Sequence, residues 1–187
     1  MTIMAPKRER LVEAAQTMFY QQGVSRTTLA DIAQQAQVPL GNIYYHFRTK
    51  EALVEAVIQA HERELQSMFT RWEQLPNARE RLLALLAVSR KQESVLARYG
   101  CPHGSLCQEL DKEETPLVQV GACMFQMYLD WAQIQFLQLG RGEQEAKDLA
   151  IDLISSLQGT FVLTTTFRDP NLLERKLQRL ETWVRDL

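Results

Sequence analysis

The sequence contains no apolar run approaching the roughly 20 residues needed to cross a bilayer, and its first residues lack a signal-peptide core. We therefore expect no membrane segment and a cytoplasmic protein. Cysteine is scarce and odd in number (Cys101, Cys107 and Cys123), which argues against a structural disulfide framework. With 8 glycines and 6 prolines in 187 residues, the chain is not collagen-like, linker-rich or of low complexity.

The motifs of common enzymes are also missing. The sequence has no phosphate-binding loop, no acidic metal cluster and no Ser/His/Asp arrangement. Its histidines, His46, His61 and His103, fall on separate predicted elements. Cys101, His103 and Cys107 offer three possible metal ligands, but their spacing matches no common zinc pattern. We expect no catalytic residues, no metal and no cofactor; the alternative is an enzyme that acts on a small apolar substrate through His103.

Charge is present but unevenly distributed. The formal net charge of −2 argues by itself against a nucleic-acid binder. Residues 1–50, however, carry six Lys/Arg and three Asp/Glu, a net +3, whereas residues 51–187 have a net −5. The amino-terminal part is therefore the one suited to a polyanion.

Residues 27–50 predict two short helices joined by a tight turn. Thr28 and Asp31 form a capping box at the start of the first helix, and Gln37-Val38-Pro39 ends it. In the second helix, helical spacing places Leu40, Ile43 and Phe47 on one side. The other side and its flanks carry Gly41, Asn42, Tyr44, Tyr45 and His46.

This small polar face suits a recognition helix in a DNA major groove. Glycine permits close backbone approach, Asn42 can pair with a base edge, and the phenols and imidazole can donate to phosphate oxygens. Lys50, behind Thr49 as a cap, would favour a phosphate at the start of the next helix. Arg8 and Arg10 are further candidates for phosphate contact.

The same stretch resembles the DNA-binding domain of the TetR family of bacterial transcriptional regulators. The resemblance covers about the first third of the chain and rests on Thr27-Thr28, Ile32-Ala33, Val38, Gly41 to Phe47 and Lys50 to Leu53. It implies that the threonines Thr27 and Thr28 contact DNA and that the phosphates are held by Thr28, Tyr44, His46 and Lys50. It places nearer the bases Leu40, Gly41, Asn42 and Tyr45.

The patterns along the chain predict an all-α protein. A three-helix helix-turn-helix DNA-binding domain would occupy residues 1–50, and a helical ligand-binding and dimerisation domain residues 51–187. Gly23 is placed to end the first helix as a left-handed cap. The later helices are expected at residues 51–72, 78–99, 105–112, from Thr115-Pro116 to about 140, 143–167, and from Asp169-Pro170 to the end, with an irregular stretch at residues 100–104.

The last two helices are predicted to form a homodimer. Apolar residues in the final helix alternate four- and three-residue spacing, which makes a narrow seam for helix-on-helix packing. The family resemblance supports this pair as a dimer surface, although the two helices could instead cover their own domain's core. The predicted interface residues are Leu153, Leu157, Phe161, Leu173, Leu177, Leu180 and Val184.

The resemblance also implies a small-molecule pocket but supplies no motif for it. The aromatic and Met-rich helix at residues 117–139 points to an apolar or aromatic effector. The candidate ligand-binding residues are His103, Cys107, Phe125, Tyr128, Trp131 and Gln135.

These expectations describe a repressor that binds a palindromic double-stranded DNA operator as a homodimer and is released by its effector. The alternative is a thiol-based redox or electrophile sensor using Cys101 and Cys107. That alternative requires a cysteine with a lowered pKa.

Overall fold

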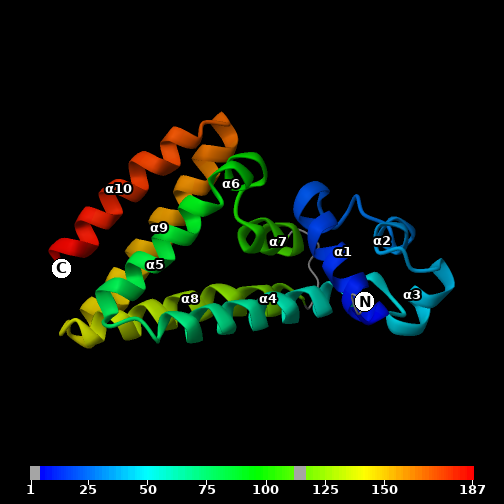
Figure 1. Ribbon diagram of the computed structural model, residues 1–187, viewed down its shortest axis with the longest axis horizontal. Coiled ribbons are helices and arrows are strands. Elements are labelled where there is room, and N and C mark those ends of the chain that lie inside the picture. Colours follow the sequence, from blue (N-terminus) through cyan, green and yellow to red (C-terminus); the bar gives the residue numbers. More distant parts are fainter. Residues whose placement is uncertain (1–4, 112–116) are drawn as a thin grey trace. The chain divides into compact units, whose positions relative to one another are not determined.

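The computed structural model describes residues 5–111 and 117–187, and side chains in the second range from residue 122 onward. Helices joined by short turns account for nearly all of these residues, and no strand occurs among them (Figure 1). The predicted all-α class is therefore confirmed. Lys112 and the predicted Thr115-Pro116 cap lie outside the described residues.

The chain divides into two compact units. The first comprises the described residues up to Glu64 and those within 105–122; the second comprises Leu65–Gly104 and Cys123–Leu187. This division differs from the expected boundary at residue 50, because the long helix that starts at Lys50 contributes its first 15 residues to the first unit.

The first unit contains α1 (Lys7–Gln22), α2 (Leu29–Gln35), α3 (Leu40–His46), the start of α4 (Lys50–Trp72) and most of α7 (Pro102–Asp111). Its apolar side chains recur at helical spacing and converge on one core. Leu11, Ile32, Ile43 and Leu53 each have no exposed surface. The two seven-residue helices α2 and α3 are thus stabilised by burial shared with α1 and α4, because helices of this length are marginal alone.

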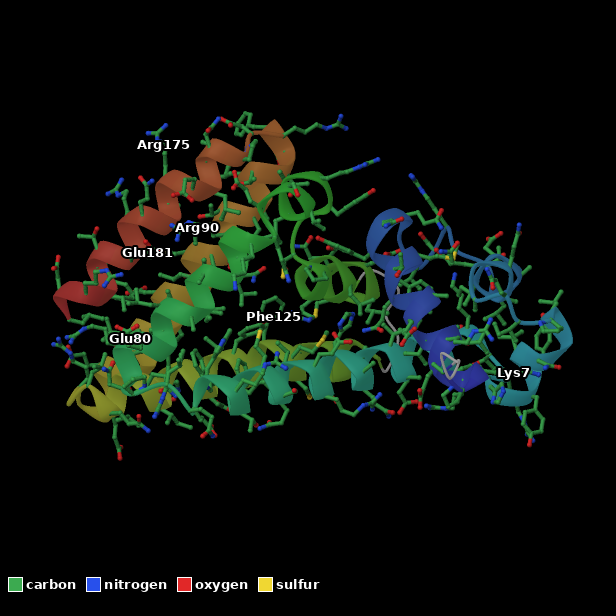
Figure 2. All side chains as sticks on the ribbon, in the orientation of Figure 1. Lys7, Glu80, Arg90, Phe125, Arg175 and Glu181 are labelled. Atoms are coloured by element: carbon green, nitrogen blue, oxygen red, sulfur yellow. The ribbon has the colours of Figure 1, made fainter. Side chains whose placement is uncertain are left out.

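The second unit contains the end of α4, α5 (Ala78–Lys91), α6 (Glu93–Tyr99), most of α8 (Leu117–Gln138), α9 (Glu143–Phe167) and α10 (Pro170–Asp186). The chain turns back after α9, and α10 runs beside α9 and α5 (Figure 1). Arg90 of α5 meets α10 through Glu174, at 2.8 Å, and Glu181, at 2.5 Å (Figure 2). Hydrogen bonds to Glu181 and Glu174 raise the pKa of the Arg90 guanidinium, which stays charged.

Two expected elements are corrected. The helix expected at residues 78–99 breaks at Gln92, whose N–H bonds the Val88 and Ser89 carbonyls before α6 starts. The stretch expected to be irregular at residues 100–104 is helical from Pro102, which opens α7. The Cys101 thiol accepts a hydrogen bond from the Gly104 N–H at 3.4 Å and so caps this helix. The expected helix at residues 143–167 and the Asp169 cap are confirmed.

The predicted dimer residues lie inside their own unit. They are between 0 and 6% exposed: Leu153, Leu157, Phe161, Leu173, Leu177, Leu180 and Val184. The reason is that α10 packs on α5, α6 and α9, so the narrow seam in its sequence is already filled by the same chain. Their burial within one chain favours the alternative, a domain core, over a dimer surface.

Candidate nucleic-acid interface

The start of α2 has the geometry that its sequence predicts. The Thr28 hydroxyl accepts the Asp31 N–H at 3.2 Å, and the Asp31 carboxylate accepts the Thr28 N–H at 3.0 Å. Hydrogen bonds from the Thr28 hydroxyl and N–H lower the pKa of Asp31. The capping box is therefore confirmed, and it fixes the end of α2 that carries the exposed Thr28 side chain.

Thr27 does not have the role expected for it. Its side chain is 1% exposed, and its hydroxyl donates to the Gly23 carbonyl at 2.7 Å. A buried hydroxyl with this bond cannot reach a phosphate, so Thr27 shapes the turn between α1 and α2. Gly23 itself has φ +90° and ψ 158°, a positive φ but not the left-handed helical cap that was expected.

The turn between α2 and α3 is held from α1. Gln37 adopts φ +53°, and the Val38 N–H bonds the Ala33 carbonyl at 2.9 Å. The Arg10 guanidinium donates to the carbonyls of Ala36 and Gln37, the latter at 2.9 Å. Arg10 is thus a structural residue and not the phosphate contact that was considered.

Most side chains of the α3 helix are exposed or half-buried. Ile43 is fully buried, whereas Tyr44 is 53% and Tyr45 86% exposed. Asn42 and His46 are half-buried, and the rings of Tyr45 and His46 meet edge to face at 5.1 Å between centroids. Leu40 is 47% exposed, which corrects its placement on the core side because the first turn of α3 projects beyond the core.

Gly41 stands on this exposed side of α3. A Cβ built at Gly41 would meet nothing within 4 Å, and its φ is not in the positive region. Glycine in a helix costs about 0.5–1 kcal/mol relative to alanine. No neighbour in the described part of the first unit therefore accounts for a glycine at this position.

Lys50 begins α4 beside this surface. The Thr49 hydroxyl accepts the Ala52 N–H at 3.2 Å, which confirms Thr49 as the cap of this helix. The helix start and the half-buried Lys50 side chain together form a cationic position. Arg8, from the start of α1, instead lies over the Phe47 ring at 5.2 Å, a cation–π contact.

The second unit groups some of the candidate ligand residues. The Tyr128 hydroxyl and His103 Nδ1 are 3.4 Å apart, and Phe69 packs edge to face on Tyr128 and stacks on Trp131 at 5.0 Å between centroids. The ring centroids of Trp72 and Trp131 are 5.2 Å apart. Burial raises the pKa of the Tyr128 phenol, with the nearby Cys101 as a smaller cause. The Trp131 indole N–H is buried and, among the described residues, has no hydrogen-bond partner.

Other candidates are placed elsewhere or are already engaged. The Gln135 amide donates to the Trp131 carbonyl within α8 at 3.2 Å and accepts from Arg81 of α5 at 3.4 Å, so its side chain is already engaged. Phe125 is half-buried in the second unit, whereas Cys107 belongs to the first. Sequence reasoning misassigned Arg10 and missed Arg81 and Glu109, since each bonds a backbone or side-chain group that the local pattern does not reveal.

The redox alternative is not supported at Cys101. Burial raises the pKa of the Cys101 thiol, the opposite of what a reactive thiolate needs. None of the three cysteines is in a disulfide. Within residues 5–111 and 117–187, no set of three His, Cys, Asp or Glu side chains is placed to hold a metal. No helix in these ranges has both the length and the apolar character to span a membrane.

The capped α2, the tight turn and the outward-facing α3 define a helix-turn-helix protein of the DNA-binding class. A family model described as "Bacterial regulatory proteins, tetR family" matches residues 11–57, which include these three features. An uncharacterized HTH-type transcriptional regulator of Mycobacterium tuberculosis is 30% identical over 189 residues, covering 95% of each chain. The chain belongs to the TetR family of transcriptional regulators.

Two further comparisons differ in how much of the chain they cover. A TetR transcriptional regulator from Legionella pneumophila has the same fold, with a TM-score of 0.83 and 21% identity over 97% of this chain and 98% of that one. The HTH-type transcriptional regulator TtgR of Pseudomonas putida is 52% identical, but over 53 residues only, 28% of this chain and 25% of that protein. The match to TtgR therefore spans about a quarter of that protein's length.

Proposed function

We propose that this TetR-family regulator is a homodimeric repressor that binds a palindromic operator and releases it when a small aromatic effector binds the second unit. The observation that carries the proposal is the exposed side of α3. Two tyrosines and a glycine that the chain's own packing does not require stand together there. This composition suits insertion into a major groove, with Asn42 and Tyr45 toward the bases and Tyr44, His46, Thr28 and Lys50 toward phosphates.

A second copy of the chain is proposed to cover the outer side of α9. Four large apolar side chains stand exposed there: Ile151 at 45%, Val162 at 54%, Leu163 at 52% and Phe167 at 66%. Gly159 lies among them in mid-helix, and a Cβ at Gly159 would meet nothing within 4 Å. An exposed apolar row with an unexplained glycine favours close helix-to-helix contact across a two-fold axis, which would also pair two α3 helices on a palindrome.

The proposed effector is aromatic and carries a hydrogen-bond acceptor. Phe69, Trp72 and Trp131 offer ring surfaces, while the unpartnered Trp131 N–H calls for an acceptor. His103 and Tyr128, whose ring packs on Phe69, add polar groups. Such a ligand releases DNA only if it binds the non-binding arrangement more tightly than the binding one.

The test is selection of duplexes from a random-sequence pool by the purified full-length protein, followed by sequencing and salt-dependent affinity measurements. We expect enrichment of an inverted repeat and a logarithmic affinity that falls linearly with logarithmic salt. Tyr45→Ala should lose sequence preference, while the exposed control Gln59→Ala on α4 should retain it. Failure to enrich any sequence at low salt would refute the proposal.

A further inference from the structure

Glu109, near the end of α7, binds the turn between α1 and α2. One carboxylate oxygen accepts the Val24 N–H at 2.8 Å, and the other accepts the Ser25 N–H at 2.7 Å. Both bonds are charge-assisted and lie at the short end of the normal range. A single side chain therefore holds two consecutive backbone groups that are 84 and 85 residues away in sequence.

The turn is built to admit this carboxylate. Gly23 has φ +90°, and a Cβ at that position would lie 3.0 Å from one Glu109 oxygen and 3.1 Å from the other. Glycine thus serves both the backbone conformation and the approach of the side chain. The acid is ionised in this setting. Burial raises the pKa of Glu109, but the Ser25 and Val24 N–H groups, with the charge of Lys50, outweigh it and hold the pKa below the ordinary value.

The turn that the Glu109 carboxylate holds is followed directly in the chain by residues that we propose to contact DNA. Two residues after Ser25, the Thr27 hydroxyl bonds back to the Gly23 carbonyl at 2.7 Å, and Thr28 then caps α2. The position of the α2 start, and with it the Thr28 side chain, follows from the conformation of residues 23–27. Glu109 also stands close enough to Lys50 for the two charges to interact. Two of the proposed phosphate-binding positions are therefore within its influence.

The same helix carries a residue of the proposed effector site. α7 runs for ten residues, and His103, which meets Tyr128, precedes Glu109 by about 9 Å along the axis. A helix shift of about 1–2 Å, common in regulated proteins, is enough to take bonds of 2.7 and 2.8 Å out of range. Ser25 is an exposed residue, so its N–H can bond to water when the Glu109 carboxylate moves away.

We propose that Glu109 is a positioning residue for operator binding. Its carboxylate holds the α1–α2 turn in the DNA-binding conformation, and displacement of α7 releases that turn. The inference rests on the proposed function, because it assigns a role in recognition to a side chain that does not itself touch DNA. A glutamate that served stability alone would change unfolding without changing affinity for the duplex.

The test compares full-length wild type with Glu109→Gln, using the duplex that wild type selects from a random pool. The amide keeps the size of the side chain but presents one acceptor and one donor to two N–H groups, so one bond must fail. We expect about a tenfold or greater loss of affinity, because the Thr28 contact is displaced. The slope of affinity against salt should stay unchanged, because the Thr28 hydroxyl is uncharged and no cationic side chain is removed. Hydrogen exchange at the Val24 and Ser25 amides should accelerate by a similar factor.

Three further variants make the result decisive. Gln108→Ala, at the exposed neighbouring position on α7, should match wild type in all measurements. Lys50→Gln should lower affinity and also reduce the salt slope, as loss of a phosphate contact does. Glu109→Asp, which keeps the charge on a shorter side chain, should fall between wild type and Glu109→Gln.

Two outcomes overturn the inference alone: Glu109→Gln binding the duplex like wild type, or binding weakly while exchange at Val24 and Ser25 is unchanged. If the wild-type protein itself enriches no duplex, the proposed function is refuted, and this inference, which depends on it, is refuted as well. If Glu109→Gln proves too unstable to purify, Glu109→Asp replaces it, and wild-type affinity or unchanged amide exchange in that variant overturns the inference equally.

Discussion

The aromatic and polar side chains that we propose as binding groups are exposed in the first unit and buried in the second. In the first, α3 buries Ile43 and turns Tyr45 outward, 86% exposed. In the second, Trp131 and Gln135 are 5% and 1% exposed, and burial raises the pKa of Tyr128. Groups turned outward are available to a partner as large as a DNA duplex. Groups turned inward are available only to a molecule small enough to enter among them.

The difference also separates two uses of apolar residues at helical spacing. The regularly spaced apolar residues of α10 (Leu173, Leu177, Leu180 and Val184), here called the internal row, are buried by the same chain. The apolar residues Ile151, Val162, Leu163 and Phe167 of α9, here called the outer row, are exposed. Large apolar side chains left together on a surface usually mark a contact. The row that looks most like an interface in the sequence is therefore the core, and the less regular row is the proposed interface.

The largest expected effect is on the internal row. Leu173→Ala should lower the free energy of unfolding by about 3 kcal/mol, because it leaves a cavity around a residue with no exposed surface. Urea denaturation followed by circular dichroism measures it. Val162→Ala, at a 54% exposed position on α9, should change stability by less than about 1 kcal/mol. Monomers of unchanged stability from Leu173→Ala would contradict the assignment of α10 to the core.

An intermediate effect is expected on the outer row. Val162→Asp should weaken association by at least about 2 kcal/mol, since two-fold symmetry would bury a carboxylate from each copy in an apolar contact. Sedimentation velocity at a fixed concentration should show monomers with unchanged helix content. The exposed α4 variant Thr70→Asp adds the same charge elsewhere and should remain dimeric. A dimeric Val162→Asp protein would remove α9 as the proposed surface.

The smallest effect on stability, and an effect of opposite sign on binding, is expected at Gly41. Gly41→Ala should stabilise the protein by about 0.5 kcal/mol, because alanine favours a helix and meets no neighbour within 4 Å. Affinity for the selected duplex should nevertheless fall about tenfold, because the added methyl holds α3 away from the groove. Thermal unfolding and fluorescence anisotropy measure the two changes. If affinity rises along with stability, α3 does not approach DNA through Gly41.

Much of the first unit was predictable because its signals are local. The capping box joins Thr28 and Asp31, three positions apart, and the Thr49 cap also acts three positions along the chain. The burial of Ile43 follows from helical spacing. Leu40 was misplaced because spacing gives the direction of a side chain but not how far the core extends under the first turn. Thr27 was misassigned because a motif does not say whether a hydroxyl faces solvent or its own turn.

The second unit was predictable as a set of helices but less so as a site. The ends of α9 and the Asp169 cap match expectation, whereas the break at Gln92 does not, since no Gly or Pro marks it. The pairing of His103 with Tyr128 joins residues 25 apart and was expected only from composition. Gln135 is committed to Arg81, 54 residues away, and nothing in the sequence near either residue reveals that bond.

The turn between α2 and α3 places a glutamine where glycine would be relaxed. Gln37 at φ +53° costs on the order of 1 kcal/mol, and the guanidinium of Arg10 holds its carbonyl in place. The angle between the two helices is thus set by a residue on a third. On the proposed function, a substitution at position 10 is therefore expected to change operator preference through the turn between α2 and α3. A comparison of operator preferences that considered only the residues of α2 and α3 would therefore overlook the contribution of Arg10.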